Sequence, residues 1–282
     1  MGETTLISVC ILTLNEERNL PACLEALSWA DDIVIVDSFS SDKTVEIARA
    51  AGARVYQRAY DGEDRQRLFA LKEIEYRHDW VFMPDADEIV TPELRDEMLA
   101  IAADPTRPEC LFRIRYKNMF MGRWIKHSSL YPTWMTRFFR PDRIIGFERP
   151  EHAIPTGIGP EGRLQAHYLH YSFNNGLGAW YEKHNRYSSS EAMETLASHG
   201  DYSIPWGKIF SMRSEVRRRG LKALSMRVPF RSAARFIYMF IFRGGFLDGL
   251  EGYHYCQLIA AYEYMIVIKT KELKRRQQGL PV

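Results

Sequence analysis

The first hundred residues alternate short apolar segments with helical ones, and this alternation limits the possible folds more than any other feature of the chain. The apolar segments are continuous and rich in β-branched residues, which is typical of buried strands. Strands that alternate with helices form right-handed crossover units and a parallel sheet, so we expect an α/β fold. The expected strands are Ile7–Thr13, Ile33–Asp37, Arg54–Gln57 and Trp80–Pro84, and the expected helices begin near Asn19, follow Ser38–Asp42, and cover Asp64–Arg77 and Thr91–Ala102.

The pattern changes beyond Pro108. Cys110–Tyr116 and Thr136–Arg140 alternate apolar and polar residues, which predicts half-exposed antiparallel strands. A loop rich in proline and glycine is expected over residues 150–162, and mostly helical structure from Trp180 onward.

The stretch Trp80–Val90 indicates a ligand site. Its apolar run ends in three carboxylates, at Asp85, Asp87 and Glu88. Ligands of open α/β sheets bind at the carboxyl ends of the strands, and a second expected strand also ends in an aspartate, Asp37. Neighbouring carboxylates repel each other unless a cation lies beside them, and oxygen ligands favour magnesium, manganese or calcium. We therefore expect a site for a metal-bound diphosphate. The alternative is a solvated acidic turn that caps the following helix.

The sequence lacks the patterns of several other site types. No Gly-x-Gly-x-x-Gly follows the first strand, which argues against a dinucleotide-binding dehydrogenase, and no Gly-Lys-Ser/Thr phosphate-binding loop is present. The four cysteines are far apart and fit neither a zinc site nor a disulfide framework, which suggests reduced thiols in a cytosol. The first residues lack a basic stretch, so no secretory signal is expected.

The charge of the chain is unevenly distributed. Residues 201–282 contain 15 Lys and Arg against 6 Asp and Glu, whereas residues 1–200 contain 23 against 30. A basic region of this kind favours an anionic partner. We expect the basic, aromatic stretch Arg213–Arg243 to form an amphipathic helix on an anionic membrane surface, because its longest apolar run, Phe236–Phe242, is far shorter than the roughly 20 residues of a membrane span. The alternative is a solvated basic helix. No nucleic acid is expected, and Tyr253–Ile268 is predicted to be a core helix or a homo-oligomer contact.

Three motifs resemble those of the inverting family 2 glycosyltransferases of GT-A fold. They are Ser8–Glu17, Val36–Ala48 and Asp85–Leu94, and they match in order, spacing and residue type. Two later segments, His170–Ser172 and Lys183–Tyr187, resemble the bacterial branch that glucosylates the lipopolysaccharide inner core and related glycolipids.

The resemblance implies a GT-A (Rossmann-like), mixed and mainly parallel sheet flanked by helices, with a helical, basic C-terminal extension. Residues 1–108 would form the half that binds the nucleotide sugar, and residues 109–200 the half that binds the acceptor. Residues 201–282 would form a helical region that associates with a membrane.

The resemblance also implies site residues. Gln66 and Arg67 stand where the family has a Gln-Lys/Arg pair near the base or diphosphate. Leu68 departs from the family pattern, which commonly has an asparagine at this position, so the contact of that asparagine is not expected here. Asp87 is implied as the direct ligand of a Mn2+ or Mg2+ ion, with Asp85 nearer the ribose. The implied substrate-binding positions are Thr13, Asn15, Glu16, Asp37, Arg67, Asp85 and Arg186, and the implied metal-binding positions are Asp87 and Asp85.

Inverting transfer needs a base that takes the proton of the acceptor hydroxyl. The family branch often has His-Glu where this chain has Glu151-His152, so both residues are candidate catalytic bases, and His152 is also a candidate metal ligand. The alternative is that these side chains lie in a solvated loop.

We therefore predict a metal-dependent hexosyltransferase that moves glucose from a UDP-sugar to a lipid-linked or lipopolysaccharide-core acceptor in cell-envelope biosynthesis. It would work in the cytoplasm, on the inner face of the cytoplasmic membrane. Two alternatives stay open: a sugar-phosphate nucleotidyltransferase, and an inert protein that binds a sugar nucleotide or acts as a membrane scaffold. The sequence lacks the Gly-rich loop usual in the first, and the paired aspartates argue against the second.

Overall fold

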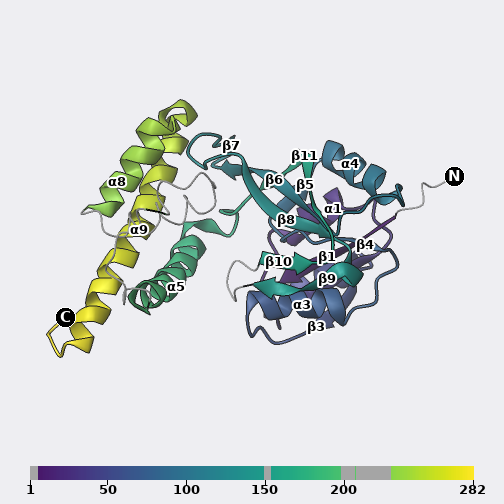
Figure 1. Ribbon diagram of the computed structural model, residues 1–282, viewed down its shortest axis with the longest axis horizontal. Coiled ribbons are helices and arrows are strands. Elements are labelled where there is room, and N and C mark those ends of the chain that lie inside the picture. Colours follow the sequence, from purple (N-terminus) through teal and green to yellow (C-terminus); the bar gives the residue numbers. More distant parts are fainter. Residues whose placement is uncertain (1–5, 149–153, 198–206, 208–229) are drawn as a thin grey trace. The chain divides into compact units, whose positions relative to one another are not determined.

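The computed structural model describes residues 6–148, 154–197, 207 and 230–282 (Figure 1). The chain forms two compact units. We call the unit of Met1–Trp124 and Tyr131–Asn175 the sheet unit, and the unit of Ile125–Leu130 and Gly176–Val282 the helical unit.

The sheet unit is built on a mixed sheet whose strand order is β3-β2-β1-β4-β8-β6-β11-β5. The strands β1 to β4 run parallel to one another, and β11 runs parallel to β6. The strand β8 is antiparallel to both β4 and β6, and β5 is antiparallel to β11. The strands of this sheet are β1 (Ile7–Thr13), β2 (Ile33–Asp37), β3 (Arg54–Gln57), β4 (Trp80–Phe82), β5 (Glu88–Val90), β6 (Leu111–Phe120), β8 (Thr133–Phe139) and β11 (Glu161–His170). The short strand β7 (Arg123–Trp124) pairs with β6. The strands β9 (Ile144–Glu148) and β10 (Ile154–Gly157) form a separate hairpin.

Helices cover both faces of this sheet. They are α1 (Leu20–Ala26), α2 (Thr44–Ala50), α3 (Glu63–Lys72), α4 (Pro92–Ala102) and the short 3-10 helix η1 (Pro141–Arg143). Side chains of a strand point alternately to its two faces. Ile7, Val9 and Ile11 of β1 therefore pack with α1 and α4, whereas Cys10 packs on the other face with α3. Burial of both faces explains why these strands are continuous apolar runs in the sequence.

Most of the expected elements of the first hundred residues are confirmed. The helix expected over Asp64–Arg77 ends earlier, at Lys72. Thr91 caps α4 through its Oγ1, which accepts a hydrogen bond from the Leu94 N–H at 3.3 Å. Asn19 precedes α1, but its amide donates to Glu16 Oε2 instead of capping the helix.

The sequence patterns did not predict β11. This strand buries Leu164 and Tyr168 fully and leaves its other side chains at least partly exposed, so it lacks the apolar run of a central strand. It becomes a strand because β6 and β5, which are remote in sequence, pair with it on both sides. The β9–β10 hairpin was also not predicted.

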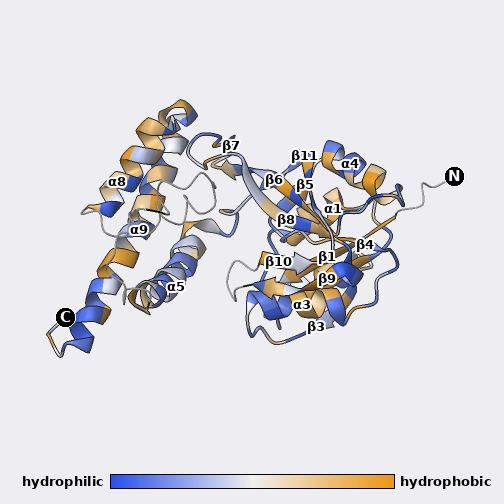
Figure 2. Cartoon of the chain, viewed as in Figure 1, coloured by the Kyte–Doolittle hydropathy of each residue, from blue (hydrophilic) through white to orange (hydrophobic). Residues whose placement is uncertain are grey.

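The helical unit contains α5 (Gly176–Ala197), α8 (Arg231–Ile237), the π-helical turn η3 (Tyr238–Phe242), the 3-10 helix η4 (Gly245–Asp248) and α9 (Gly249–Gln277). Lys269 of α9 joins α9 to α5 by donating to Asn185, Ser188 and Ser189. Helical structure from about residue 180 is confirmed for the described part of this region. The last turn of α9 is hydrophilic and basic (Figure 2).

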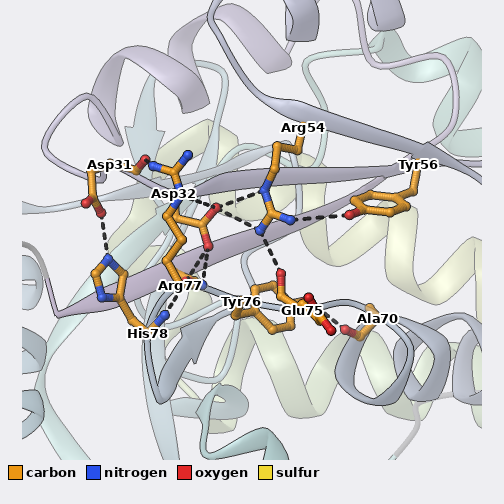
Figure 3. Close-up of polar contacts among 10 residues, drawn as sticks. Asp31, Asp32, Arg54, Tyr56, Ala70, Glu75, Tyr76, Arg77 and His78 are labelled. Carbon is orange, nitrogen blue, oxygen red and sulfur yellow. Dashed lines mark hydrogen bonds and ion pairs between the residues drawn. The ribbon is translucent and has the colours of Figure 1, made fainter.

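Asp32 ties the amino-terminal ends of three strands together (Figure 3). Its side chain is almost fully buried and accepts from Ser8 Oγ at 2.6 Å, from Arg54 Nη2 at 2.8 Å and from the Arg77 backbone N–H at 2.9 Å. Burial alone would raise the pKa of the Asp32 carboxyl, but the hydrogen bonds from Arg77, Ser8 and Arg54 hold it below its usual value. This contact lies at the opposite end of the strands from Asp37.

We predict that Asp32→Asn destabilises the protein by about 2 kcal/mol at neutral pH, because the amide cannot accept the charged hydrogen bonds that the carboxylate accepts. A carboxyl whose pKa is lowered on folding stabilises above its unfolded pKa, and this stabilisation is lost as the pH falls through the folded pKa. The difference between wild type and variant in urea unfolding should therefore be largest near pH 7 and shrink below about pH 4. A constant difference across this range would show that the charge of Asp32 is not involved.

Candidate active site

Aspartates from β2 and β4, the two strands that flank β1, lie at the carboxyl edge of the parallel part of the sheet. Asp37 ends β2 and pairs in register with Thr13 on one side and Gln57 on the other. Asp85 follows β4 and forms a bridge with Leu12 of β1. The arrangement follows from the parallel strand order, as the sequence predicts.

Asp37 is enclosed by hydrogen-bond donors of the protein. Its carboxylate accepts from Thr13 Oγ1 at 3.0 Å, from Gln57 Nε2 at 3.3 Å, and from both the backbone N–H and the hydroxyl of Ser40. The side chain is fully buried. Asp37 thus fixes the start of the loop after β2, and its expected contact with a base or ribose stays a prediction.

The loops that follow β1 and β2 are joined to each other by polar contacts. The Asn15 N–H donates to Ser40 Oγ at 2.8 Å, and its side-chain oxygen accepts from the Ser41 N–H at 2.8 Å. Asn15 has a φ of 57°, a left-handed conformation that asparagine tolerates better than most residues. The Glu16 N–H donates to Thr44 Oγ1 at 2.8 Å. Asn15 and Glu16 therefore shape one rim of the strand ends.

Asp85 lies between two arginines. Arg67 Nη2 donates to its Oδ1 at 3.2 Å, and Arg137 of β8 donates to its Oδ2. Arg137 also donates to Glu88 Oε1 at 2.7 Å, and the Asp85 N–H donates to Glu88 Oε2 at 3.1 Å. Because both oxygens of Asp85 accept from arginines in this structure, its role as a metal ligand stays a prediction.

Arg137 and Glu88 form a buried ion pair that the sequence did not reveal. The exposed fraction is 3% for the side chain of Arg137 and 2% for that of Glu88. Burial by itself would lower the pKa of Arg137, but the charges of Asp85 and Glu88 keep it well above its usual value. The guanidinium therefore stays charged and neutralises carboxylates on two segments. The signal for Arg137 in the sequence is weak: it is the only charged residue of β8, which otherwise contains aromatic residues, a methionine and two threonines.

Arg67 also donates through Nε to Glu63 Oε1 at 2.9 Å, which holds its guanidinium against α3. Its Nη1 is buried and has no hydrogen-bond partner among the described residues. A fixed guanidinium with an unused N–H edge suits an anionic group of a ligand. The neighbouring Gln66 is held by Ser38 and Arg58.

Asp87 faces His170, the last residue of β11. The distance between Asp87 Oδ2 and His170 Nε2 is 3.4 Å. Burial lowers the pKa of His170, but the negative charges of Asp87, Glu88 and Asp85 outweigh this effect and raise it above its usual value. The Tyr171 N–H donates a hydrogen bond to the Asp87 carbonyl oxygen at 2.8 Å. His170 belongs to a segment that resembles a family motif, but the sequence patterns give no reason to place it in the site, because they do not predict β11.

The pair Asp87 and His170 fits two positions of a divalent-cation site. A carboxylate oxygen and an imidazole nitrogen are both common ligands of Mn2+, and Mg2+ typically keeps only one or two carboxylates and completes its shell with phosphates and water. The described residues contain no group of three His, Cys, Asp or Glu side chains arranged to hold a metal. The described residues alone therefore offer an incomplete ligand set, which a diphosphate could complete.

For three of the expected site residues the structure gives no position relative to this edge. Glu151 and His152, the candidate bases, lie outside the described residues. Arg186 is exposed on α5 and belongs to the helical unit. The roles of these three residues stay predictions.

A pocket of about 510 Å3 opens beside Asp87. It lies between α1, the segment that leads into β5, and the residues that follow β11. Its size is within the range of about 300–1,000 Å3 that small-molecule sites occupy.

Comparison with known proteins gives a consistent result. The model of glycosyl transferase family 2 matches residues 8–159. An uncharacterized glycosyltransferase of Rickettsia prowazekii is 33% identical over 97% of this chain and 89% of that protein. The lipopolysaccharide core biosynthesis glycosyltransferase LpsC of Rhizobium meliloti is 37% identical over 56% of this chain and 58% of that protein. Among solved structures, residues 1–349 of S. aureus TarS in complex with UDP-GlcNAc align with 97% of this chain and 92% of that one, at 17% identity and a TM-score of 0.43.

We predict that Arg137→Met destabilises the protein by about 3–5 kcal/mol, because it leaves the buried Glu88 carboxylate without its cation. Changing Glu88 to Gln in the same protein should recover part of this loss, and Arg137→Lys, which keeps the charge, should cost less than Arg137→Met. Chemical unfolding of the three variants and wild type measures these differences. If Arg137→Met and the double variant have the same stability, the ion pair does not carry the stabilisation.

Proposed function

Because the chain belongs to glycosyl transferase family 2, we propose that it transfers a hexose from a UDP-sugar to a lipid-linked or lipopolysaccharide-core acceptor. The observation that carries this proposal is the placement of Asp87 and His170 at 3.4 Å from each other, at the sheet edge where Asp85 and Arg67 also lie. This arrangement supports the binding of a cation and a diphosphate at one place.

The transfer is a displacement at the anomeric carbon of the donor sugar. The oxygen of the acceptor hydroxyl forms a bond to this carbon, the bond from the carbon to the diphosphate oxygen breaks, and the hydroxyl proton goes to a base. Negative charge develops on the departing diphosphate. Asp87 and His170 would hold a divalent cation, which when bound neutralises this charge.

The two arginines of the site would bind the diphosphate and neutralise the carboxylates. The unused edge of Arg67 would bind a phosphate oxygen, and Arg137 fixes Asp85 while it neutralises Glu88. We keep Glu151 and His152 as the proposed bases, on the ground of the family motif that they resemble.

The proposed acceptor class is supported by one relative. LpsC is by its name a glycosyltransferase of lipopolysaccharide core biosynthesis, and more than half of this chain matches it at 37% identity. Glucose as the transferred hexose and UDP as the carrier are proposed from the motifs at Ser8–Glu17, Val36–Ala48 and Asp85–Leu94.

The helical unit supports a place of action at an anionic membrane surface. Within the described part of the chain, no helix has the length and apolarity needed to cross a bilayer. The segment from Tyr238 to the first turn of α9 nevertheless leaves large apolar side chains in solvent, among them Phe242 at 77% and Leu250 at 72% exposure. Arg243 is exposed between them. Aromatic and aliphatic side chains beside cations suit the headgroup region of anionic lipids, where the glycolipid acceptor would lie.

The donor assay tests the proposed reaction. We expect the protein to release UDP slowly from a UDP-hexose in the presence of Mn2+, and Asp87→Asn and His170→Ala to lower this rate by about a hundredfold or more, because each removes a cation ligand. The exposed carboxylate Glu93 gives a matched control, and Glu93→Gln should leave the rate unchanged. Release of pyrophosphate would instead indicate a nucleotidyltransferase, and an absence of both binding and turnover would contradict the proposal.

Vesicle flotation tests the membrane surface. We expect the full chain to float with vesicles that contain anionic lipid and not with neutral ones. The change of Arg217, Arg218 and Arg219 to Glu, and separately Phe242→Ser with Leu250→Ser, should each reduce the bound fraction. Ile158→Ser replaces an equally exposed apolar residue of the sheet unit and should bind as wild type does. Equal binding of all these proteins would count against a membrane contact through this region.

A further inference from the structure

One face of β6 carries positive charge that the proposed transfer does not use. Arg113, Arg115 and Lys117 are alternate residues of β6, so their side chains point to the same face of the sheet. Ile114 and Tyr116, which lie between them in the sequence, pack with α1 and α4 on the opposite face. The three cations therefore lie on the face of the sheet that α4 does not cover.

The neighbouring strands extend this positive charge. Arg163 of β11 pairs in register with Arg113, and His167 of β11 pairs with Arg115. On the other side of β6, Trp134 of β8 pairs with Arg115. Residues that are paired across neighbouring strands share a face of the sheet. We call this surface the cationic face, and its residues are Arg113, Arg115, Lys117, Trp134, Arg163 and His167.

Aromatic rings hold the cations of this face in place. The guanidinium carbon of Arg163 lies 5.4 Å from the ring centroid of Trp134, and that of Arg115 lies 6.0 Å from the same centroid. Lys117 Nζ lies 4.6 Å from the ring centroid of Trp124. A guanidinium stacked on a ring keeps N–H groups in its own plane for hydrogen bonds, which suits a phosphate or a carboxylate.

The protein compensates little of this charge. Arg113 pairs with Glu161 at 2.7 Å. Within the described ranges, no carboxylate forms an ion pair with Arg115, Lys117 or Arg163. Because Arg115 and Arg163 lie against one indole ring, their charges repel each other unless an anion lies beside them.

His167 reports the same positive field. Burial lowers the pKa of this imidazole most, and the charges of Lys117 and Arg115 lower it further. Glu93 acts in the opposite direction, but its effect is the smallest. The cations beside His167 therefore outweigh the carboxylate beside it.

The cationic face is separate from the proposed cation site. His170 packs edge-on against Tyr116, which lies on the opposite face of β6. None of the residues of the cationic face lines the pocket beside Asp87. An anion bound to this face would therefore leave the donor site free.

We propose that the cationic face binds an oligosaccharide that carries phosphate or carboxylate groups. Its charge selects an anion, and its stacked guanidinium groups suit anions of this shape. Trp124 and Trp134 are half-buried and lie against the cations, so they cannot insert into a lipid headgroup layer as a membrane contact requires. That this saccharide is the acceptor of the transfer rests on the proposed function.

The experiment compares trigalacturonic acid, which has a carboxylate on each ring, with maltotriose, a neutral saccharide of the same length. Calorimetry measures the binding of each to the full chain at low and at high salt. The test variant combines Arg115→Gln with Arg163→Gln. The control variant combines Arg49→Gln with Arg65→Gln, which removes the same charge from exposed positions of α2 and α3.

We expect wild type to bind trigalacturonic acid and not maltotriose, and high salt to weaken this binding because dissolved ions screen the charges. The test variant should lose affinity by about tenfold or more, whereas the control variant should bind as wild type does. Lys117→Gln alone should also weaken binding, and this single change gives the answer if the double substitution unfolds the protein.

Equal affinities of wild type and the test variant, or an absence of binding by wild type, would show that the cationic face is not a saccharide site. Oligo(dT) or anionic vesicles are the competing occupants. If either binds more tightly than trigalacturonic acid and loses this binding in the test variant, the saccharide is the wrong ligand. An absence of UDP-hexose binding and turnover contradicts the proposed function and the acceptor role, whereas the saccharide titrations decide the surface itself.

Discussion

The compensation of negative charge at the carboxyl ends of the strands is the constraint on which the site depends. Asp85, Asp87 and Glu88 lie within four residues, and water cannot neutralise a carboxylate that is as buried as Glu88. Arg137 of β8 forms ion pairs with Asp85 and Glu88, and Arg67 of α3 forms one with Asp85. No arginine of the described residues contacts Asp87, which instead pairs with His170. The protein thus neutralises two carboxylates internally and leaves the third with a partner that can share a cation.

The two halves of the sheet contribute differently to this arrangement. The parallel strands β1 to β4 deliver the aspartates, because strands that run in one direction end at one edge. The strands β8 and β11 arrive from the later part of the chain and bring Arg137 and His170 to that edge. The site is therefore assembled from segments of the early and the later part of the chain, and the mixed topology of the sheet is what makes the assembly possible.

The contacts around Asp37 and Asn15 show a second use of polar side chains. Here hydroxyl and amide groups of the protein satisfy the aspartate, and the loops after β1 and β2 are held together. The contrast with Asn19 and Arg67 is informative. Each of these two has a buried polar atom that no described residue satisfies, and both lie beside the acidic segment. The satisfied groups around Asp37 give the loops at this edge their shape.

The sequence by itself determined the parallel half of the fold and the clustering of its aspartates. Continuous β-branched runs, helix start signals and the position of each aspartate after a strand are local features, and the strand order of β1 to β4 follows from short crossovers. Only the tertiary structure decided which groups face these aspartates. Arg137 looks like any surface arginine in its strand, and His170 ends a strand with no apolar run, since β11 exists only through pairing with β5 and β6. Periodicity reports which side chains face a core, but it carries no information about which distant charge a buried carboxylate will meet.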